Sequence, residues 1–248
     1  MNTHYLGKPQ PMQFGIRRRQ LLNHGIFLDE AYWERKLPVH YSEILARAVS
    51  PVSNFRKRML YYRLCWSILI DGGTQRIWID RSTDKICLMV SAKALDITFG
   101  LDSRYWEWVS KESSRFDHAA ELKSVECFQV WQRIDCALLT PETEYSVRFV
   151  LRIDKQKMSE CPSQFTFSLI ADGKSTESAI CLDDFTKVVD VPKKTDFIIQ
   201  RNGWTEFVAG EFVSKKHGES CEIEVCMKNT DSYPKSGIVI DGVKIEPK

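Results

Sequence analysis

The spacing of apolar residues along the chain changes near residue 70. Before that point it follows the 3.6-residue period of amphipathic helices. One apolar stripe comprises Tyr41, Ile44, Leu45 and Ala48 and stops before Pro51. A second comprises Phe55, Met59, Tyr62 and Trp66, with Arg56, Lys57 and Arg63 on the opposite face. We therefore expect a helical segment at residues 31–69, after a weakly ordered N-terminus at residues 1–30 that shows no clear period.

After residue 70, apolar and polar positions alternate, as is typical of strands with one buried face. Residues 77–91 predict a hairpin around a polar turn. Further strands are predicted at 145–153, 165–170, 204–212, 221–227 and 236–245, and a loop with a short strand at 186–201. Helical character is expected only at 103–110 and 114–122. This pattern predicts an all-β fold, a jelly-roll-like β-sandwich spanning residues 70–248, with a short helical N-terminal segment.

The charge of the chain is nearly balanced. Its 35 basic and 33 acidic residues give a net charge of +2, so no general attraction to nucleic acid or to an anionic membrane is expected. No apolar run reaches the length of a membrane span, and the N-terminal residues lack the apolar stretch of a secretory signal. We therefore expect a cytoplasmic or nuclear protein.

The eight cysteines do not predict a metal site. In a reducing compartment free thiols are the default. The closest pairs, Cys127 with Cys136 and Cys221 with Cys226, have odd separations, which would put their side chains on opposite faces of a strand. The five histidines are scattered. We interpret the cysteines as small buried hydrophobic residues and expect neither a metal nor a cofactor.

Catalytic motifs are missing from the sequence. It contains no P-loop, no GxGxxG turn, no GxSxG elbow and no HExxH helix. The alternating strands and the aromatic residues instead favour a binding protein over an enzyme.

Residues 103–110, SRYWEWVS, hold three aromatic rings within four positions. Ser103 is a competent N-cap, which favours a turn of helix with Tyr105 and Trp108 on one face and Trp106 turned outward. Local composition alone leaves open whether the rings are core or a platform for a ligand. A platform would suit a pyranose, whose C–H face packs on an aromatic ring while carboxylates and amides bind its hydroxyls.

Motifs around and beyond this stretch are recognisable. They are CLMVSAKALDITFGLDSRYWEWVSKESSRFDHAAELKSVECFQVWQRID (87–135), NGWTEFVAGEFV (202–213), CEIEV (221–225) and KSGIVIDGVKIEPK (235–248). They resemble the plant phloem protein 2 family, which includes the jasmonate-inducible tobacco lectin. LCWSILIDGGTQRIWID (64–80) resembles the segment that joins this domain to an F-box in plant F-box lectins, and YWERKLP (32–38) resembles the end of the F-box.

The resemblance implies a nucleocytoplasmic β-sandwich lectin for N-acetylglucosamine oligomers and N-glycan cores. The sugar-binding positions of the family match Phe99, Trp106, more weakly Trp108, and then Glu222 and Asn229. Phe99 stands where the family has a tryptophan, and Asn229 where it has an acid. The alternation in 221–227 independently places Glu222 on the polar face of its strand, where it either contacts a ligand or is simply solvated. Our hypothesis is that Phe99, Trp106 and Glu222 form a weakened sugar site.

Three functions remain open from the sequence. The first is a carbohydrate-binding module whose partners are glycans or glycoproteins. The second is a substrate-recognition adaptor of a cullin-type ubiquitin ligase. Since nothing in residues 1–30 resembles the opening of an F-box, the adaptor-binding surface is expected to be incomplete. The third is a protein-interaction domain with a degenerate sugar site.

Overall fold

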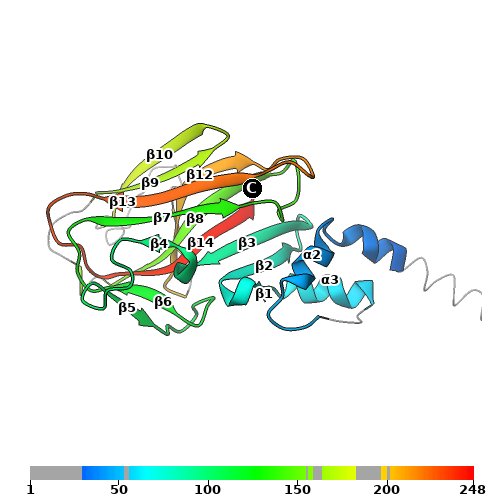
Figure 1. The fold of residues 1–248 in the computed structure, drawn as a ribbon, viewed down its shortest axis with the longest axis horizontal. Helices are drawn as coiled ribbons and strands as arrows, with labels where there is room; N and C mark the ends of the chain where they lie inside the picture. Colours follow the sequence, from blue (N-terminus) through cyan, green and yellow to red (C-terminus); the bar gives the residue numbers. More distant parts are fainter. Residues whose placement is uncertain (1–29, 53–55, 155, 159–163, 183–196, 200–201) are drawn as a thin grey trace, which may run out of the picture.

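The computed structural model describes residues 30–52, 56–154, 156–158, 164–182, 197–199 and 202–248. The predictions for residues 1–30 and 186–201 therefore lie largely outside the described residues. Residues 30–36 are helical and are followed by α2 (Tyr41–Ala46) and α3 (Lys57–Cys65). Figure 1 shows these helices at one end of a β-sandwich that contains all the described strands. No helix among the described residues is long and apolar enough to cross a membrane.

The sandwich consists of two antiparallel sheets. The described part of the first sheet has the order β1-β2-β3-β14-β8-β12-β11, and β6 joins it beside β14 and carries β5. The second sheet has the order β10-β9-β13-β7-β4. The bounds of the first sheet are β1 (Ile68–Ile70), β2 (Gln75–Asp80), β3 (Lys85–Ser91), β5 (Trp106–Val109), β6 (Ala119–Leu122), β8 (Glu144–Ile153), β11 (Phe197–Ile199), β12 (Thr205–Val213) and β14 (Ile238–Pro247). Those of the second sheet are β4 (Asp96–Ile97), β7 (Phe128–Asp135), β9 (Gln164–Ala171), β10 (Lys174–Cys181) and β13 (Glu222–Asn229).

The main core lies between the two sheets. Alternate residues of each strand point into it, as the sequence pattern predicts. The ring of Phe167 on β9 is stacked 5.3 Å from that of Phe207 on β12 and lies 5.8 Å from that of Phe149 on β8. Each such buried phenylalanine contributes roughly 1.5–3 kcal/mol through removal of apolar surface from water. The predicted all-β, jelly-roll-like sandwich with a short helical N-terminal segment is therefore confirmed.

The outer face of the first sheet carries a buried charge network. Glu206 on β12 is fully buried, and its carboxylate accepts a hydrogen bond of 2.9 Å from Lys244 Nζ and lies 3.3 Å from Arg148 Nη1. Nearby, the buried carboxylate of Asp241 accepts hydrogen bonds from Ser114 Oγ and from the backbone N–H of Arg115. Burial raises the pKa of Asp241 although these donors oppose the shift. The network lets acidic residues occupy buried sheet positions.

Helix α3 buries a different face from the one predicted. Leu60, Tyr61 and Leu64 are buried, whereas Met59 is exposed and Trp66 is 75% exposed. The prediction of an apolar face through Met59, Tyr62 and Trp66 is thus wrong; its first member, Phe55, lies outside the described residues. The sequence of α3 has two apolar stripes, and its packing against β2 selects the one that is buried.

The two predicted short helices in the sandwich are strands. Residues 106–109 form β5 and residues 119–122 form β6, and the two pair with each other, Trp106 opposite Leu122. β6 in turn pairs with β14. The local sequence favours a helix, but pairing of β5 with β6 and of β6 with β14 satisfies backbone donors and acceptors of both segments in the strand conformation. The predicted hairpin at 77–91, in contrast, is confirmed as β2 and β3. Single 3₁₀ turns, η1 (Asp71–Gly73) and η2 (Ala92–Ala94), flank this hairpin.

Candidate functional site

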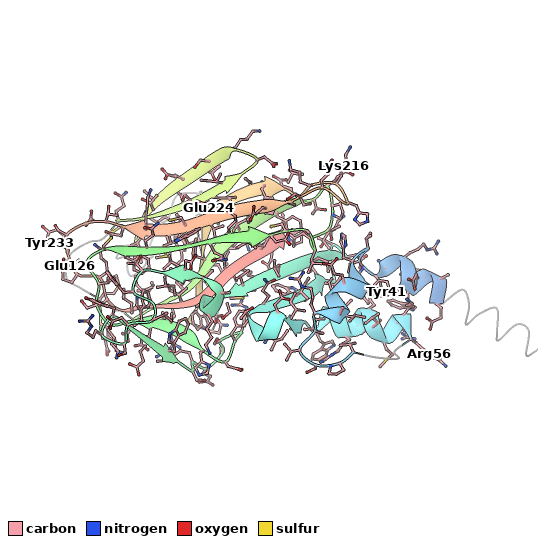
Figure 2. The ribbon with its side chains drawn as sticks, viewed as in Figure 1. Tyr41, Arg56, Glu126, Lys216, Glu224 and Tyr233 are labelled. Atoms are coloured by element: carbon pink, nitrogen blue, oxygen red, sulfur yellow. The ribbon has the colours of Figure 1, made fainter. Side chains whose placement is uncertain are left out.

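The candidate site lies at the end of the sandwich that is distant from the helices. Its central element is the loop of residues 98–105, which connects β4 to β5. The backbone N–H of Thr98 donates to the carbonyl of Gln129, which fixes the loop beside the start of β7. Glu126 and Tyr233 mark this end of the molecule in Figure 2, and Tyr41 and Arg56 mark the other end.

Two aromatic rings form an open platform on this loop. The Phe99 side chain is 53% exposed, and its ring stacks on that of Tyr105 at 4.8 Å with an angle of 29° between the planes. Phe99 has a positive φ of 58°, a conformation that is uncommon outside glycine. The turn is held by the N–H of Asp102, which donates to the carbonyl of Phe99 at 2.9 Å. The loop therefore turns a large apolar ring toward solvent and supports it from one side.

Polar groups flank this platform. The Asp102 carboxylate accepts hydrogen bonds from the guanidinium of Arg104, the shortest at 2.6 Å, and this hydrogen bonding holds the pKa of Asp102 below its usual range. The Arg104 guanidinium also lies 5.5 Å from the centre of the Tyr105 ring. An open depression of about 620 Å³ is lined by Ile97, Phe99, Gly100, Leu101, Asp102 and Ser103. Leu101, Asp102 and Arg104 were not predicted as site residues, because no sequence pattern marks the neighbours of an exposed ring.

Trp106 is part of the core, not an outward platform. Only 3% of the residue is exposed, and its indole Nε1–H donates to the carbonyl of Thr98 at 3.0 Å. Its ring lies 5.9 Å from that of Phe128 on β7. The predicted outward orientation is wrong because residues 106–109 form a strand whose first residue points inward. Trp106 therefore secures the loop that carries Phe99 and offers no face to a ligand.

Two other predicted site residues lie near this core contact. Trp108 is half-buried two positions further along β5 and packs against the main core. Asn229 is only 3% exposed and stands opposite Phe128, the residue that Trp106 contacts. The Asn229 side-chain oxygen accepts a hydrogen bond of 2.9 Å from the N–H of Asp231, while its Nδ2 has no hydrogen-bond partner among the residues that the structure describes. Asn229 thus shapes the loop after β13 from within.

Glu222 is remote from the aromatic loop. It lies at the start of β13 and Asn229 at the end, a separation of seven residues or about 23 Å along the strand. The odd separation also places the two side chains on opposite faces of the sheet. Glu222 is exposed, as predicted, and lies 3.9 Å from Arg133 Nε on β7. The structure therefore does not bring Phe99, Trp106 and Glu222 into one site.

No group of three or more potential metal ligands occurs among the residues that the structure describes. The cysteines in those ranges are free thiols. The loop of residues 98–105 offers a ligand aromatic rings, a carboxylate, a guanidinium group and backbone polar groups. Such a set can bind a neutral ligand that has an apolar face and hydroxyl groups at its rim.

Solved structures with partial similarity include carbohydrate-binding modules. A family 35 carbohydrate-binding module from Clostridium thermocellum matches 64% of this chain and 96% of its own length, at 7% identity and a TM-score of 0.37. The module TmCBM61, solved with β-1,4-galactotriose, matches 62% of this chain and 87% of its own, at 12% identity and a TM-score of 0.34. Similarity at TM-scores this low does not indicate the function of the chain.

Sequence relatives are more informative. The F-box protein At2g02240 of Arabidopsis thaliana is 28% identical over 226 residues, which cover 88% of this chain and 68% of the relative. The F-box protein PP2-A15 of the same plant is 29% identical over 241 residues, which cover 90% and 77%. The sequence profile named Phloem protein 2 matches residues 85–247, which include nearly all of the sandwich and the whole aromatic loop. The chain therefore belongs to the phloem protein 2 family.

Proposed function

We propose that the β-sandwich is a lectin-like module that binds N-acetylglucosamine oligomers or N-glycan cores, with Phe99 as its stacking platform. The observation that carries the proposal is the exposure of the Phe99 ring and its support by Tyr105 at 4.8 Å. The apolar C–H face of a pyranose packs on such a ring, and a ring already held in place loses little conformational entropy on binding.

The polar part of the proposed site comes from the loop itself. Asp102 is a hydrogen-bond acceptor beside the platform, and Arg104 and Ser103 supply donors. The carboxylate–guanidinium pair can bind sugar hydroxyls without leaving a charge unpaired. This arrangement replaces Glu222, which lies too far along β13 to contact a sugar on Phe99.

The test is calorimetric titration of the folded protein with chitotriose. We expect Phe99→Ala to weaken binding by about 2 kcal/mol, the size typical of a truncated binding hot spot. Trp66→Ala is the matched control, because Trp66 is an exposed aromatic ring on the helical segment at the other end of the molecule. It should leave the affinity unchanged. Absence of binding by well-folded wild-type protein would refute the proposal and favour a protein-interaction domain with a degenerate sugar site.

A second candidate function is suggested by the relatives, which are named F-box proteins and match most of the chain. In this case the sandwich would select substrates for a cullin-type ubiquitin ligase. Co-purification of the full chain with the ligase adaptor tests this function. Stoichiometric recovery of the adaptor would support it, and recovery at background level would exclude it for this chain.

A further inference from the structure

Two cysteines lie opposite each other where the neighbouring strands β7 and β13 of the second sheet end and begin. Asp135 at the end of β7 pairs with Glu222 at the start of β13, so the next pair in the same register is Cys136 with Cys221. The N–H of Cys136 donates to the carbonyl of Cys221 at 2.7 Å, which continues the ladder by one step. Directly opposite residues of antiparallel strands have Cα atoms about 4.5–5.5 Å apart. That separation lies within the range of about 4.4–6.8 Å that a disulfide spans.

The two thiols have unequal chemistry. Both residues are buried, Cys136 at 2% and Cys221 at 6% exposure, and the Cys136 thiol lies 3.6 Å from the carbonyl of Ile134, to which it can donate. Interaction with Cys221 and burial raise the pKa of the Cys136 thiol. The Cys136 thiol and the backbone N–H of Lys215 beside the Cys221 sulfur lower the pKa of Cys221 to about 7, although burial opposes the shift. These surroundings favour the thiolate at Cys221 over the thiolate at Cys136. One nucleophilic thiolate beside one protonated thiol is the arrangement of an attacking and a resolving cysteine.

The surrounding loops hold this pair in place without a covalent bond. Ser214, upstream of Cys221, and Thr143, downstream of Cys136, are joined by two hydrogen bonds of 3.0 Å. In one, Ser214 Oγ accepts from the N–H of Thr143; in the other, the N–H of Ser214 donates to the Thr143 carbonyl. The two chain segments are thus already fixed beside each other, with the two cysteines on opposite strands.

We propose that Cys136 and Cys221 form a reversible disulfide when the protein meets hydrogen peroxide. The Cys221 thiolate attacks one peroxide oxygen; a sulfur–oxygen bond forms, the oxygen–oxygen bond breaks, and hydroxide leaves and takes up a proton to form water. The sulfur of Cys136 then attacks the sulfenic sulfur. The disulfide bond forms, the sulfur–oxygen bond breaks, and the hydroxyl group leaves as water with the Cys136 proton. In sum, two thiols lose two electrons and one peroxide becomes two waters.

Peptide mapping of the full chain by mass spectrometry tests the proposal. The protein is treated with a small excess of peroxide, alkylated and digested without reduction. We expect a peptide pair that joins Cys136 to Cys221, with a mass about 2 Da below the sum of its parts because two hydrogens are lost. Thioredoxin or dithiothreitol should restore both alkylation sites. Cys127, which is exposed, is the internal control and should be alkylated or over-oxidised instead of joining this pair.

Two variants separate the attacking from the resolving role. In Cys136→Ala, Cys221 should accumulate as sulfenic acid that a dimedone probe captures, whereas in Cys221→Ala, Cys136 should stay reduced. The wild-type mapping does not depend on the folding of either variant. The proposal is overturned if both thiols of the wild type remain alkylatable after peroxide has oxidised Cys127, or if disulfides join other cysteines instead.

Discussion

Replacing Trp106 with alanine separates the core role of this residue from a role in ligand binding. Only 3% of Trp106 is exposed. Its ring lies beside that of Phe128, and its indole N–H donates a hydrogen bond to the carbonyl of Thr98. Removal of a buried tryptophan ring typically lowers the free energy of unfolding by about 3–5 kcal/mol, and loss of a hydrogen bond that leaves the Thr98 carbonyl unpaired adds about 1 kcal/mol. Because domains of this kind are stable by only about 5–15 kcal/mol, Trp106→Ala should lose a large part of that margin.

Urea unfolding followed by far-UV circular dichroism measures this loss without relying on tryptophan fluorescence. Phe99→Ala is the matched comparison on the same loop. Since its ring is largely exposed, this change should alter the free energy of unfolding by less than about 0.5 kcal/mol. Trp106→Phe should fall between the two, because it keeps most of the packing and loses the hydrogen bond. An unfolding midpoint for Trp106→Ala equal to that of the wild type, combined with lost sugar affinity, would show that our assignment of the two rings is reversed.

Two further predictions concern charged residues. Glu206→Ala removes the buried carboxylate that Lys244 and Arg148 contact and leaves both cations to share the partly exposed Glu246. It should lower the free energy of unfolding by about 3 kcal/mol, the lower end of the loss on breaking a buried ion pair, measured by urea titration. A change below about 1 kcal/mol would contradict the burial of this network. Hydrogen bonds from Lys111 and Lys157 lower the pKa of Glu121 in the folded protein. The ionised carboxylate therefore stabilises the fold fully above the ordinary glutamate pKa of about 4.3. This stabilisation is lost as the pH falls through the lower pKa of the folded state. Glu121→Gln should therefore be less stable than the wild type at neutral pH and approach it on acidification, and a difference that grows with acid would refute this reasoning.

The strands were predictable because their signal is local. Alternation of apolar residues is enough to define β2, β3, β8 and β13. The two segments that were misassigned, β5 and β6, are short and take their conformation from each other and from β14, which follows more than a hundred residues later. The buried face of α3 was misassigned for a related reason, since packing against β2, which is distant from the local pattern, selects between its two apolar stripes.

The candidate site was predictable only in part. Phe99 lies on the loop of residues 98–105 and Trp106 begins the strand that follows it, and whether each ring faces water depends on that strand. The distance between Glu222 and Asn229 follows from strand geometry alone, because a separation of seven positions spans the whole of β13 and puts the two side chains on opposite faces. The pairing of Cys136 with Cys221 could not be foreseen, since it depends on which strands are neighbours.

The position of β14 in the first sheet has a consequence for the synthesis of the protein. β14 lies between β3 and β8, so the sheet cannot close until residues 238–247 have left the ribosome. Until then β3 and β8 have no β14 to pair with, and such open edges invite association with other chains. A premature stop before Ile238 would make that state permanent. Residues 238–247 therefore decide whether a newly made chain becomes a folded domain or a source of aggregates.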